Sequence, residues 1–252
     1  MRLLFLLLLV PLSGFAEWTL EEGEGFAQRV WASHSAGYSL KCREYVCRNK
    51  TETVKMNGVS WDSRLTLRVI DLAPGESVAA AAKKAGAVAA VNGGYFHPDR
   101  TPIGLVVSGG ETLHPWEKSR LLTGVLSVEK NGKIRILRNA EFKKTDAVRE
   151  ALQAGPFLVD RGKPVPGLNA EKAAERTVVA VDKDGGITLL VTGPITLAGL
   201  GELLAGPDFW PAKIERALNL DGGSSAALWL NGKGSLRGEW KRVRNAVIVV
   251  EK

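Results

Sequence analysis

Two tripeptides with the same pattern stand out in the sequence, each a polar residue followed by two glycines. Asn92-Gly93-Gly94 follows an apolar run in the first half of the chain, and Asp221-Gly222-Gly223 follows another in the second half. Paired glycines after a strand let the backbone turn sharply and let a ligand or a second segment come close. A duplicated unit would bring Asn92 and Asp221 to one cleft between two halves, whereas coincidence between two ordinary turns is the alternative.

Each tripeptide is preceded by the same expected elements, a helix and then a buried strand. Ser and Thr side chains can cap the first turn of a helix, and a short apolar run is typical of a buried strand. The expected elements are a helix at residues 79–85 capped by Ser77, a strand at 87–91, a helix at 197–204 capped by Thr196 and a strand at 215–220.

The rest of the chain consists of short apolar segments separated by turn signals. Asn131-Gly132 and Asp184-Gly185-Gly186 each separate two such segments and favour hairpins. Further strands are expected at residues 60–72, 103–108, 123–128, 134–137, 154–159, 177–181, 187–191, 226–230 and 243–250. The pattern therefore predicts a mixed fold of strands and helices.

The composition is that of a folded globular protein, with 45% hydrophobic and 24% charged positions among 252 residues. This apolar fraction excludes a disordered chain, and a count of two cysteines excludes a disulfide-dense scaffold. The net charge of +7 suits an anionic partner such as a phosphorylated glycan, although it could serve solubility alone. The sequence has no zinc-finger spacing or RNA-binding signature, so nucleic acid is not an expected partner.

Residues 1–16 have the pattern of a secretory signal peptide. A basic start at Arg2 is followed by an apolar run at residues 3–12 and by a small-x-small cleavage pattern, Gly14-Phe15-Ala16. The run is shorter than the roughly 20 residues that a membrane-spanning helix needs. We expect a secreted, periplasmic or cell-envelope protein whose mature chain, starting at Glu17, is not inserted in a membrane. A membrane-tethered N-terminus is the alternative.

Cys42 and Cys47 are separated by four residues. In an oxidising compartment, such a pair could form a disulfide that closes a small loop or hairpin. A zinc site would need more ligands, and His34 is the only nearby candidate. We therefore expect a disulfide, with a zinc site and two free thiols as the alternatives.

Five motifs follow one another along the chain. They are Val91-Asn92-Gly93-Gly94-Tyr95-Phe96 with Thr101-Pro102-Ile103-Gly104-Leu105-Val106-Val107, Gln153-Ala154-Gly155-Pro156, Glu175-Arg176-Thr177, Leu218-Asn219-Leu220-Asp221-Gly222-Gly223-Ser224-Ser225, and Arg244-Asn245-Ala246. This ordered set resembles the phosphodiester glycosidase family. That family includes the uncovering enzyme, which removes N-acetylglucosamine from mannose phosphate on lysosomal glycoproteins.

The resemblance implies an α+β fold of curved, mostly antiparallel sheets wrapped around helices, which could consist of two related halves. It implies one domain over residues 61–252, with residues 17–60 as an N-terminal extension that carries Cys42 and Cys47. It also implies cleavage of a sugar-1-phosphodiester at the glycosidic side, which releases a sugar and a phosphomonoester. No cofactor is expected, and the identity of the sugar does not carry over from the family.

The expected catalytic residues are Asp221, Arg176 and Asn92. Cleavage of a glycosyl–phosphate bond needs a carboxylate, so Asp221 is the candidate general base or nucleophile; a turn aspartate is the alternative. The Arg176 guanidinium could bind phosphate oxygens, unless it pairs with Glu175 or Glu171. Asn92 could orient the substrate or could cap a turn.

A wider set of residues could bind the substrate. Glycine N–H groups could form an anion-binding nest, and serine, amide and carboxylate side chains could hydrogen-bond to a sugar phosphate. The expected substrate-binding residues are Gly93, Gly94, Gln153, Gly222, Gly223, Ser224, Ser225, Asn245, Glu111 and His97. A structural role is the alternative for Gln153 and Asn245, and a surface or packing role for His97. Tryptophans could stack on sugar rings, although most are packing residues; these are Trp116, Trp210, Trp229 and Trp240.

Two other functions are alternatives to the hydrolase. A non-catalytic module that binds envelope glycans would keep the fold without the activity. A metal-dependent phosphodiesterase would use Asp221 and Glu111 as ligands, although the sequence has no histidine-rich cluster to support a metal centre. A serine hydrolase is not expected, because Gly223-Ser224-Ser225 lacks the Gly-x-Ser-x-Gly elbow.

Overall fold

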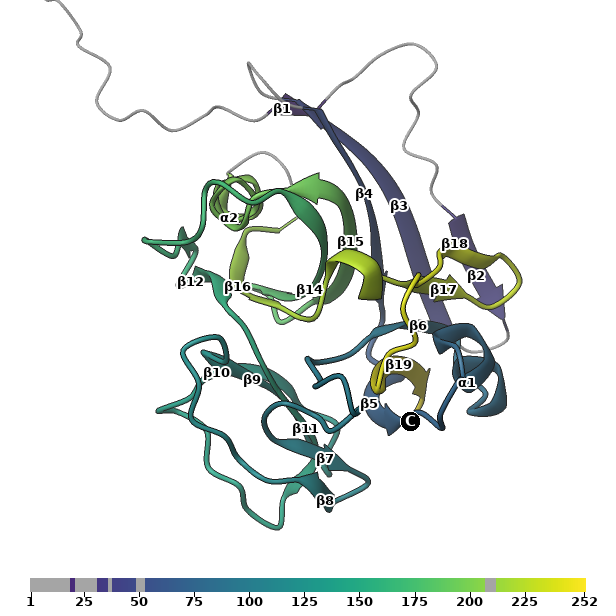
Figure 1. The fold of residues 1–252 in the computed structure, drawn as a ribbon. Coiled ribbons are helices and arrows are strands. Elements are labelled where there is room, and N and C mark those ends of the chain that lie inside the picture. Colours follow the sequence, from purple (N-terminus) through teal and green to yellow (C-terminus); the bar gives the residue numbers. More distant parts are fainter. Residues whose placement is uncertain (1–18, 21–30, 36–37, 49–52, 207–211) are drawn as a thin grey trace, which may run out of the picture.

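A computed structural model describes residues 19–20, 31–35, 38–48, 53–206 and 212–252. In this part of the chain, the strands pair antiparallel in three sheets, and two short α-helices lie against them (Figure 1). Among the described helices, none is both long and apolar enough to cross a membrane. The expected signal peptide at residues 1–16 lies outside the described residues.

The largest sheet has the strand order β1-β3-β4-β15-β14-β16-β12-β13, with β2 paired to β3. Because β4 pairs with β15, the residues expected to form an N-terminal extension share a sheet with the strand that carries Arg176. The strands are β1 (Thr19–Leu20), β2 (Trp31–Ser35), β3 (Tyr38–Arg48), β4 (Thr53–Trp61), β12 (Phe157–Asp160), β13 (Lys163–Pro164), β14 (Ala174–Asp182), β15 (Ile187–Ile195) and β16 (Ile214–Asn219).

Two smaller sheets complete the structure, with the orders β18-β17-β6-β19-β5 and β10-β9-β11-β7-β8. The first consists of β5 (Leu65–Asp71), β6 (Ala89–Asn92), β17 (Leu228–Leu230), β18 (Gly234–Arg237) and β19 (Asn245–Glu251). The second consists of β7 (Val106–Ser108), β8 (Glu111–His114), β9 (Gly124–Glu129), β10 (Ile134–Arg138) and β11 (Val148–Ala154).

Both expected helices form and both begin at the expected caps. The Ser77 hydroxyl accepts the N–H of Ala80 at the start of α1 (Val78–Lys84). The Thr196 hydroxyl accepts the N–H of Gly199 at the start of α2 (Leu197–Ala205). Helix α1 packs on the β6–β17–β19 sheet and α2 packs on the largest sheet. The antiparallel sheets agree with the fold that the resemblance implied, whereas the helices are only two short elements, each packed against one sheet.

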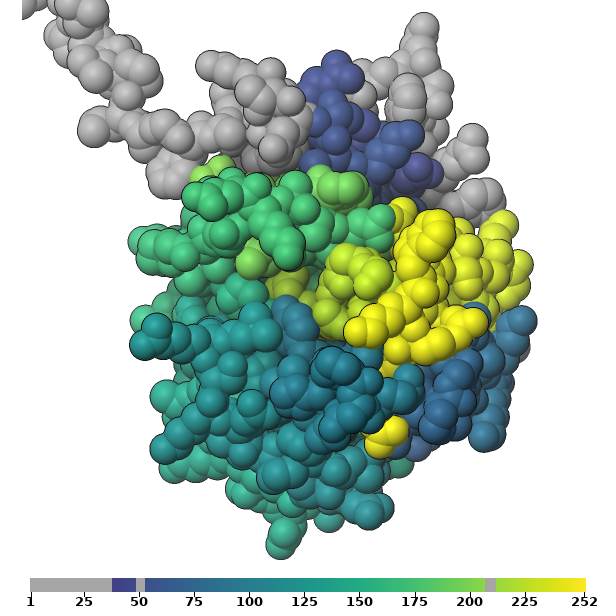
Figure 2. All heavy atoms as spheres, viewed as in Figure 1, coloured from purple at the N-terminus to yellow at the C-terminus, as the bar shows by residue number. Residues whose placement is uncertain are grey.

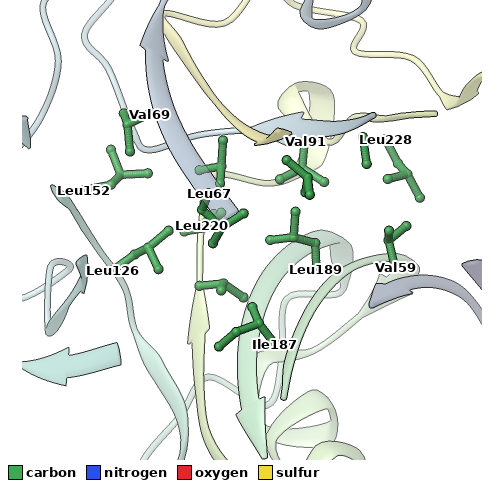
Figure 3. Packing of buried hydrophobic residues seen from close by; sticks show 14 of the residues in the cluster. Val59, Leu67, Val69, Val91, Leu126, Leu152, Ile187, Leu189, Leu220 and Leu228 are labelled. Atoms are coloured by element: carbon green, nitrogen blue, oxygen red, sulfur yellow. The ribbon is translucent and has the colours of Figure 1, made fainter. Parts of the chain in front are cut away.

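One buried cluster draws residues from all three sheets (Figure 3). Leu67 comes from β5, Leu152 from β11 and Leu189 from β15. Val91 and Leu220 also belong to it, and each directly precedes a residue of interest, Asn92 or Asp221. Because protein cores are packed as densely as organic crystals, this cluster fixes the positions of both strand ends.

The expected strand at residues 60–72 is in fact the end of β4, a turn and β5. Asp62 explains the break, because its carboxylate accepts the backbone N–H groups of Ser39 and Arg64 and so holds a turn. An aspartate that binds nearby backbone N–H groups favours a turn over a continued strand.

The expected disulfide is not formed, because Cys42 and Cys47 are both buried free thiols on β3. Five positions along an extended strand separate them by about 17 Å, far beyond the roughly 7 Å that a disulfide can span between Cα atoms. They also pack in different buried clusters. Burial raises the pKa of Cys42 to about 11 and that of Cys47 to about 12, which makes both thiols poor nucleophiles at neutral pH.

We expect the folded protein to react slowly with a thiol reagent such as DTNB and to release two equivalents of thiolate after denaturation. A reducing agent should leave Tm unchanged. A disulfide between these residues would instead stabilise the fold by roughly 2–4 kcal/mol, and its reduction would lower Tm in a thermal melt.

Candidate active site

The ends of β6 and β16 are joined by direct hydrogen bonds. The Asp221 N–H donates to Gly93 O at 3.0 Å, and Asn92 Nδ2 donates to Asp221 O at 2.7 Å. Asn92 Oδ1 accepts the hydroxyl of Thr177 at 2.6 Å and the N–H of Ala227 at 3.0 Å. Asn92 is fully buried, and its side chain is hydrogen-bonded to protein groups. It is a positioning residue that ties together segments far apart in the sequence.

Asn92 corresponds in strand position to Asn219 rather than to Asp221. Asn92 pairs with Ala246 of β19, and Asn219 pairs with Val178 of β14, in each case on the last residue of the strand. Asp221 lies two positions beyond β16. The two halves therefore resemble each other in their helix and strand order, but their polar tips are not equivalent.

Asp221 is partly buried, and several groups face its carboxylate. Oδ1 accepts the Gly222 N–H at 2.8 Å, and the Ser225 hydroxyl also hydrogen-bonds to the carboxylate. Burial raises the pKa of Asp221 above its usual value, while Ser225, Gly222 and the positive charge of Lys241 oppose this rise. A carboxylate whose pKa is raised by burial is suited to accept a proton near neutral pH.

Gly222 brings this turn against β14. A Cβ atom on Gly222 would lie 2.5 Å from Glu175 O and 3.5 Å from Arg176 Cα, so only glycine permits this approach. Glu175 forms an ion pair with Arg237 rather than with Arg176. The Asp221 turn and the arginine of the third motif are therefore in backbone contact.

Arg176 carries a positive charge that no described carboxylate neutralises. Its Nε donates to Ile195 O at 3.1 Å and its Nη2 donates to Lys172 O at 2.8 Å. It forms no ion pair within the described part of the chain. Burial lowers the pKa of the guanidinium. A partly buried cation without a counter-ion is a ready binding group for an anion.

Tyr95 lies within electrostatic range of both the acid and the cation. Its hydroxyl donates to Gly155 O at 2.7 Å and accepts from Asn219 Nδ2 at 2.8 Å. Burial, and then the negative charge of Asp221, raise the pKa of Tyr95, whereas Arg176 lowers it. Both charged groups are therefore within electrostatic reach of one phenol. On the face shown in Figure 2, the segments around residues 100, 175 and 225–240 adjoin one another.

A second cation and an exposed tryptophan lie beside Asp221. Lys241 Nζ lies 5.0 Å from the centroid of the Phe96 ring. The N–H groups of Trp240 and Lys241 both donate to Ser224 O, at 2.8 and 3.0 Å. This fixes the backbone at a position where the Trp240 side chain is 86% exposed. An exposed indole on a fixed backbone is a suitable surface for stacking against a sugar ring.

The expected nest of glycine N–H groups is not formed by three of its four members. Gly93 N–H donates to Asn245 O at 2.9 Å, and Gly94 N–H donates to Asn245 Oδ1 at 2.7 Å. Gly222 N–H donates to the Asp221 side chain. Asn245, itself buried, therefore fixes the first turn, and the glycines serve close backbone approach rather than anion binding.

Gly223, Ser224 and Ser225 form a short 3₁₀ turn after Asp221. Gly223 has a φ angle of +59°, which residues with a Cβ rarely adopt. Ser224 is exposed, whereas Ser225 is buried and bonded to the Asp221 carboxylate. Only Ser224 is therefore placed to meet a ligand through an exposed hydroxyl.

Gln153 and Glu111 lie apart from the Asp221 carboxylate. Gln153 is fully buried, where its Oε1 accepts the N–H groups of Leu105 and Glu117. Glu111 pairs with Ser108 at the turn end of β8, two strands from β11. Among the described residues, no three His, Cys, Asp or Glu side chains gather as potential ligands.

The remaining candidates differ in exposure. His97 is exposed, two residues after Tyr95. Trp116 stacks on Phe142 with ring centroids 5.9 Å apart, and Trp229 is buried in the core. Trp210 lies outside the described residues.

Four residues of the site were not expected from the sequence: Tyr95, Lys241, Thr177 and Asn219. Three of them occur within motifs quoted above, at Asn-Gly-Gly-Tyr, Glu-Arg-Thr and Leu-Asn-Leu-Asp, so their neighbours were the available signal. Lys241 had no such signal, because it reaches the site only through the backbone bonds to Ser224.

The phosphodiester glycosidase family model matches residues 85–250. The search of curated proteins found no match. The catalytic domain of zebrafish N-acetylglucosamine-1-phosphodiester alpha-N-acetylglucosaminidase, auto-inhibited by its pro-peptide, has a similar structure, with a TM-score of 0.67 and 16% identity over 89% of this chain and 88% of that one.

Two bacterial structures are similar as well. A hypothetical protein from Synechocystis has a TM-score of 0.64 and 16% identity over 94% of this chain and 68% of its own. A candidate exported protein from Burkholderia pseudomallei has a TM-score of 0.51 and 14% identity over 81% and 76% of the two chains. These likenesses establish the fold, and the family model covers most of the chain. The chain belongs to the phosphodiester glycosidase family.

Proposed function

We propose that this protein is an exported hydrolase that cleaves a sugar-1-phosphodiester between the sugar and the phosphate. The observation that carries the proposal is that Asp221, whose pKa is raised by burial, lies on a turn packed against Arg176, a partly buried cation without a counter-ion among the described residues. Such a pair suits a substrate that has an electrophilic carbon beside a negative phosphate. Family membership supports the same reaction class.

In this mechanism, Arg176 and Lys241 hold the phosphate oxygens on either side of Asp221. The bond between the anomeric carbon and the phosphate oxygen breaks, and its electron pair leaves on the phosphomonoester. Both cations stabilise that growing negative charge, which is a major source of rate enhancement in enzymes. A phosphate leaves readily without a proton, so no second carboxylic acid is required of the site.

Asp221 can act in two ways. As a general base it would take a proton from a water molecule whose oxygen forms the new bond to the anomeric carbon, and the product would have inverted configuration. As a nucleophile it would bond to that carbon first, and hydrolysis of the intermediate would give retention. The configuration of the released sugar distinguishes these routes.

The Trp240 indole would form the sugar-binding surface of this site. It is exposed on a backbone that two N–H groups fix to Ser224 O, so the indole is presented to a ligand at a defined point of the surface. A phosphorylated glycan of the cell envelope or the extracellular space is the proposed substrate class. The net charge of +7 favours such an anionic partner.

The direct test is incubation of the purified protein with an alkyl diester of N-acetylglucosamine 1-phosphate, without added metal. Proton and phosphorus NMR should show free sugar and an alkyl phosphate. Release of sugar phosphate and alcohol would mean that the other ester bond is cut, and activity abolished by a chelator would favour a metal-dependent phosphodiesterase. Binding without turnover across a panel of diesters would favour a glycan-binding module.

Replacement Asp221→Asn should lower kcat by about 10²–10⁴-fold. Burial raises the folded-state pKa of Asp221, so ionisation of this group opposes folding above its unfolded pKa and the amide should not destabilise the protein at neutral pH. A thermal melt provides the control. A variant that keeps a near-normal rate would remove Asp221 from the mechanism.

Activity should require ionised Asp221, so kcat/KM should fall as the pH falls through a pKa above the usual aspartate value. The charge of Lys241 lowers this pKa, so Lys241→Met should move the acid limb to higher pH. Lys163→Met is the matched control, because it removes one charge from an exposed side chain on β13. It should leave the pH profile unchanged. If the acid limb of Lys241→Met stayed at the same pH, Lys241 would have no influence on the ionisation of Asp221 in the reaction.

Replacement Arg176→Met should lower kcat/KM for the diester by roughly 10²-fold or more, because the transition-state charge loses its partner. Arg176→Lys should recover part of this loss, since it keeps the charge but not the two-pronged geometry. Inhibition by inorganic phosphate should weaken in parallel with the loss in kcat/KM. Equal inhibition of all three proteins would show that Arg176 does not bind phosphate.

A further inference from the structure

Glu150 is a fully buried carboxylate that the proposed mechanism does not use. Its Oε2 accepts the N–H groups of Val69 and Gly109, each at 3.2 Å. Its Oε1 lies 3.7 Å from Arg149 Nε and 3.9 Å from Arg68 Nε, and has no hydrogen-bond partner among the described residues. Two guanidinium groups therefore share one buried negative charge, and the second positive charge has no counter-ion there.

Both arginines line a cavity of about 440 Å³. Its walls come from β5, the end of α1, the β9–β10 turn and the end of β19. Lys130 and Lys252 add two more cations, against the carboxylates of Glu129 and Glu251. Glu129 is already paired with Arg135 at 3.2 Å, so the lining keeps an excess of positive charge.

A second hollow of about 390 Å³ adjoins the first, because Lys130 lines both. Its other charged residues are Lys144 and Asp146. A ligand longer than one sugar phosphate could therefore continue from one hollow into the next along the same lysine.

The cavity is separate from the candidate active site but is connected to it by β5. Asp71 at one end of β5 pairs with Asn245, beside the Asn92 turn. Thr66, near the other end, lines the cavity. Five residues of an antiparallel strand span about 17 Å, so the cavity lies about that far from the end of β5 beside the Asn92 turn.

We infer that this cavity is a second binding site, which holds phosphate groups of the same polymeric glycan at a distance from the bond that is cut. Arg68 and Arg149 bind the phosphate, Glu150 fixes both guanidinium groups, and Lys130 binds the next repeat. The choice of ligand rests on the proposed function, whereas the anion site itself rests on these side chains alone. A glycan polymer is favoured over a small anion because Lys130 lines both hollows, which places two binding positions next to each other.

The test uses the Asp221→Asn variant, which should bind without turnover. Two probes are compared by calorimetry: the methyl diester of N-acetylglucosamine 1-phosphate, and a linear polymer of about ten N-acetylglucosamine residues joined through 1-phosphodiesters. Adding Lys130→Glu and Arg149→Glu should weaken binding of the polymer by about tenfold or more and leave the monomer unchanged. Lys163→Glu, on β13 of another sheet, is the control for each single charge reversal and should change neither.

NMR spectra of the labelled protein report the cavity independently of turnover. The polymer should shift the backbone amide signals of Gly132 and Arg149, which line the cavity. Unshifted signals, or equal weakening by Lys163→Glu, would overturn the site while leaving the proposed function intact. A single-stranded DNA oligomer that binds the same residues more tightly than the polymer would overturn the choice of ligand. Polymer binding at the cavity with no monomer hydrolysis by the native protein would instead overturn the proposed function alone.

Discussion

The hydrogen bonds between the ends of β6 and β16 are the constraint on which the candidate site depends. Asp221 N–H donates to Gly93 O and Asn92 Nδ2 donates to Asp221 O, across 129 positions of sequence. Each end emerges from the shared core through Val91 or Leu220. Because the core fixes both strands and the hydrogen bonds fix their tips, the Asp221 carboxylate is held where water is partly excluded. Its raised pKa is a consequence of that position.

The same packing keeps charges apart that would otherwise neutralise each other. Glu175, adjacent to Arg176, pairs with Arg237, so Arg176 is left with carbonyl partners only among the described residues. A partly buried guanidinium without a counter-ion costs stability. A loss of stability of this kind is typical of functional sites, where a charged ligand supplies the missing partner.

Local elements could be predicted from the sequence, whereas contacts between distant segments could not. Ser77 and Thr196 mark the helix starts because capping is local chemistry. The repeated pattern of a polar residue and two glycines singled out Asp221, and the family resemblance added the Arg176 motif. Asn92 was expected to orient the substrate. Its side chain hydrogen-bonds between two β-sheets, and only the folded structure reveals this contact. β11 was missed because Glu150 and Arg149 interrupt the apolar pattern of that strand, although Glu150 is fully buried.

The two arginine sites of this protein differ in how their charge is supported, and the difference fits their proposed roles. Arg176 forms no ion pair with a described carboxylate, so its positive charge is not offset before a phosphate binds. An uncompensated, partly buried charge of this kind is what stabilisation of a transition state requires. Arg68 and Arg149 form ion pairs with Glu150. These pairs orient the two guanidinium groups, but the negative charge of Glu150 reduces their attraction for an anion. Such a site binds phosphate more weakly and releases it more easily. Weak binding at the second site suits a polymer that must move along the protein after each cleavage. A tight second site would instead keep the product bound.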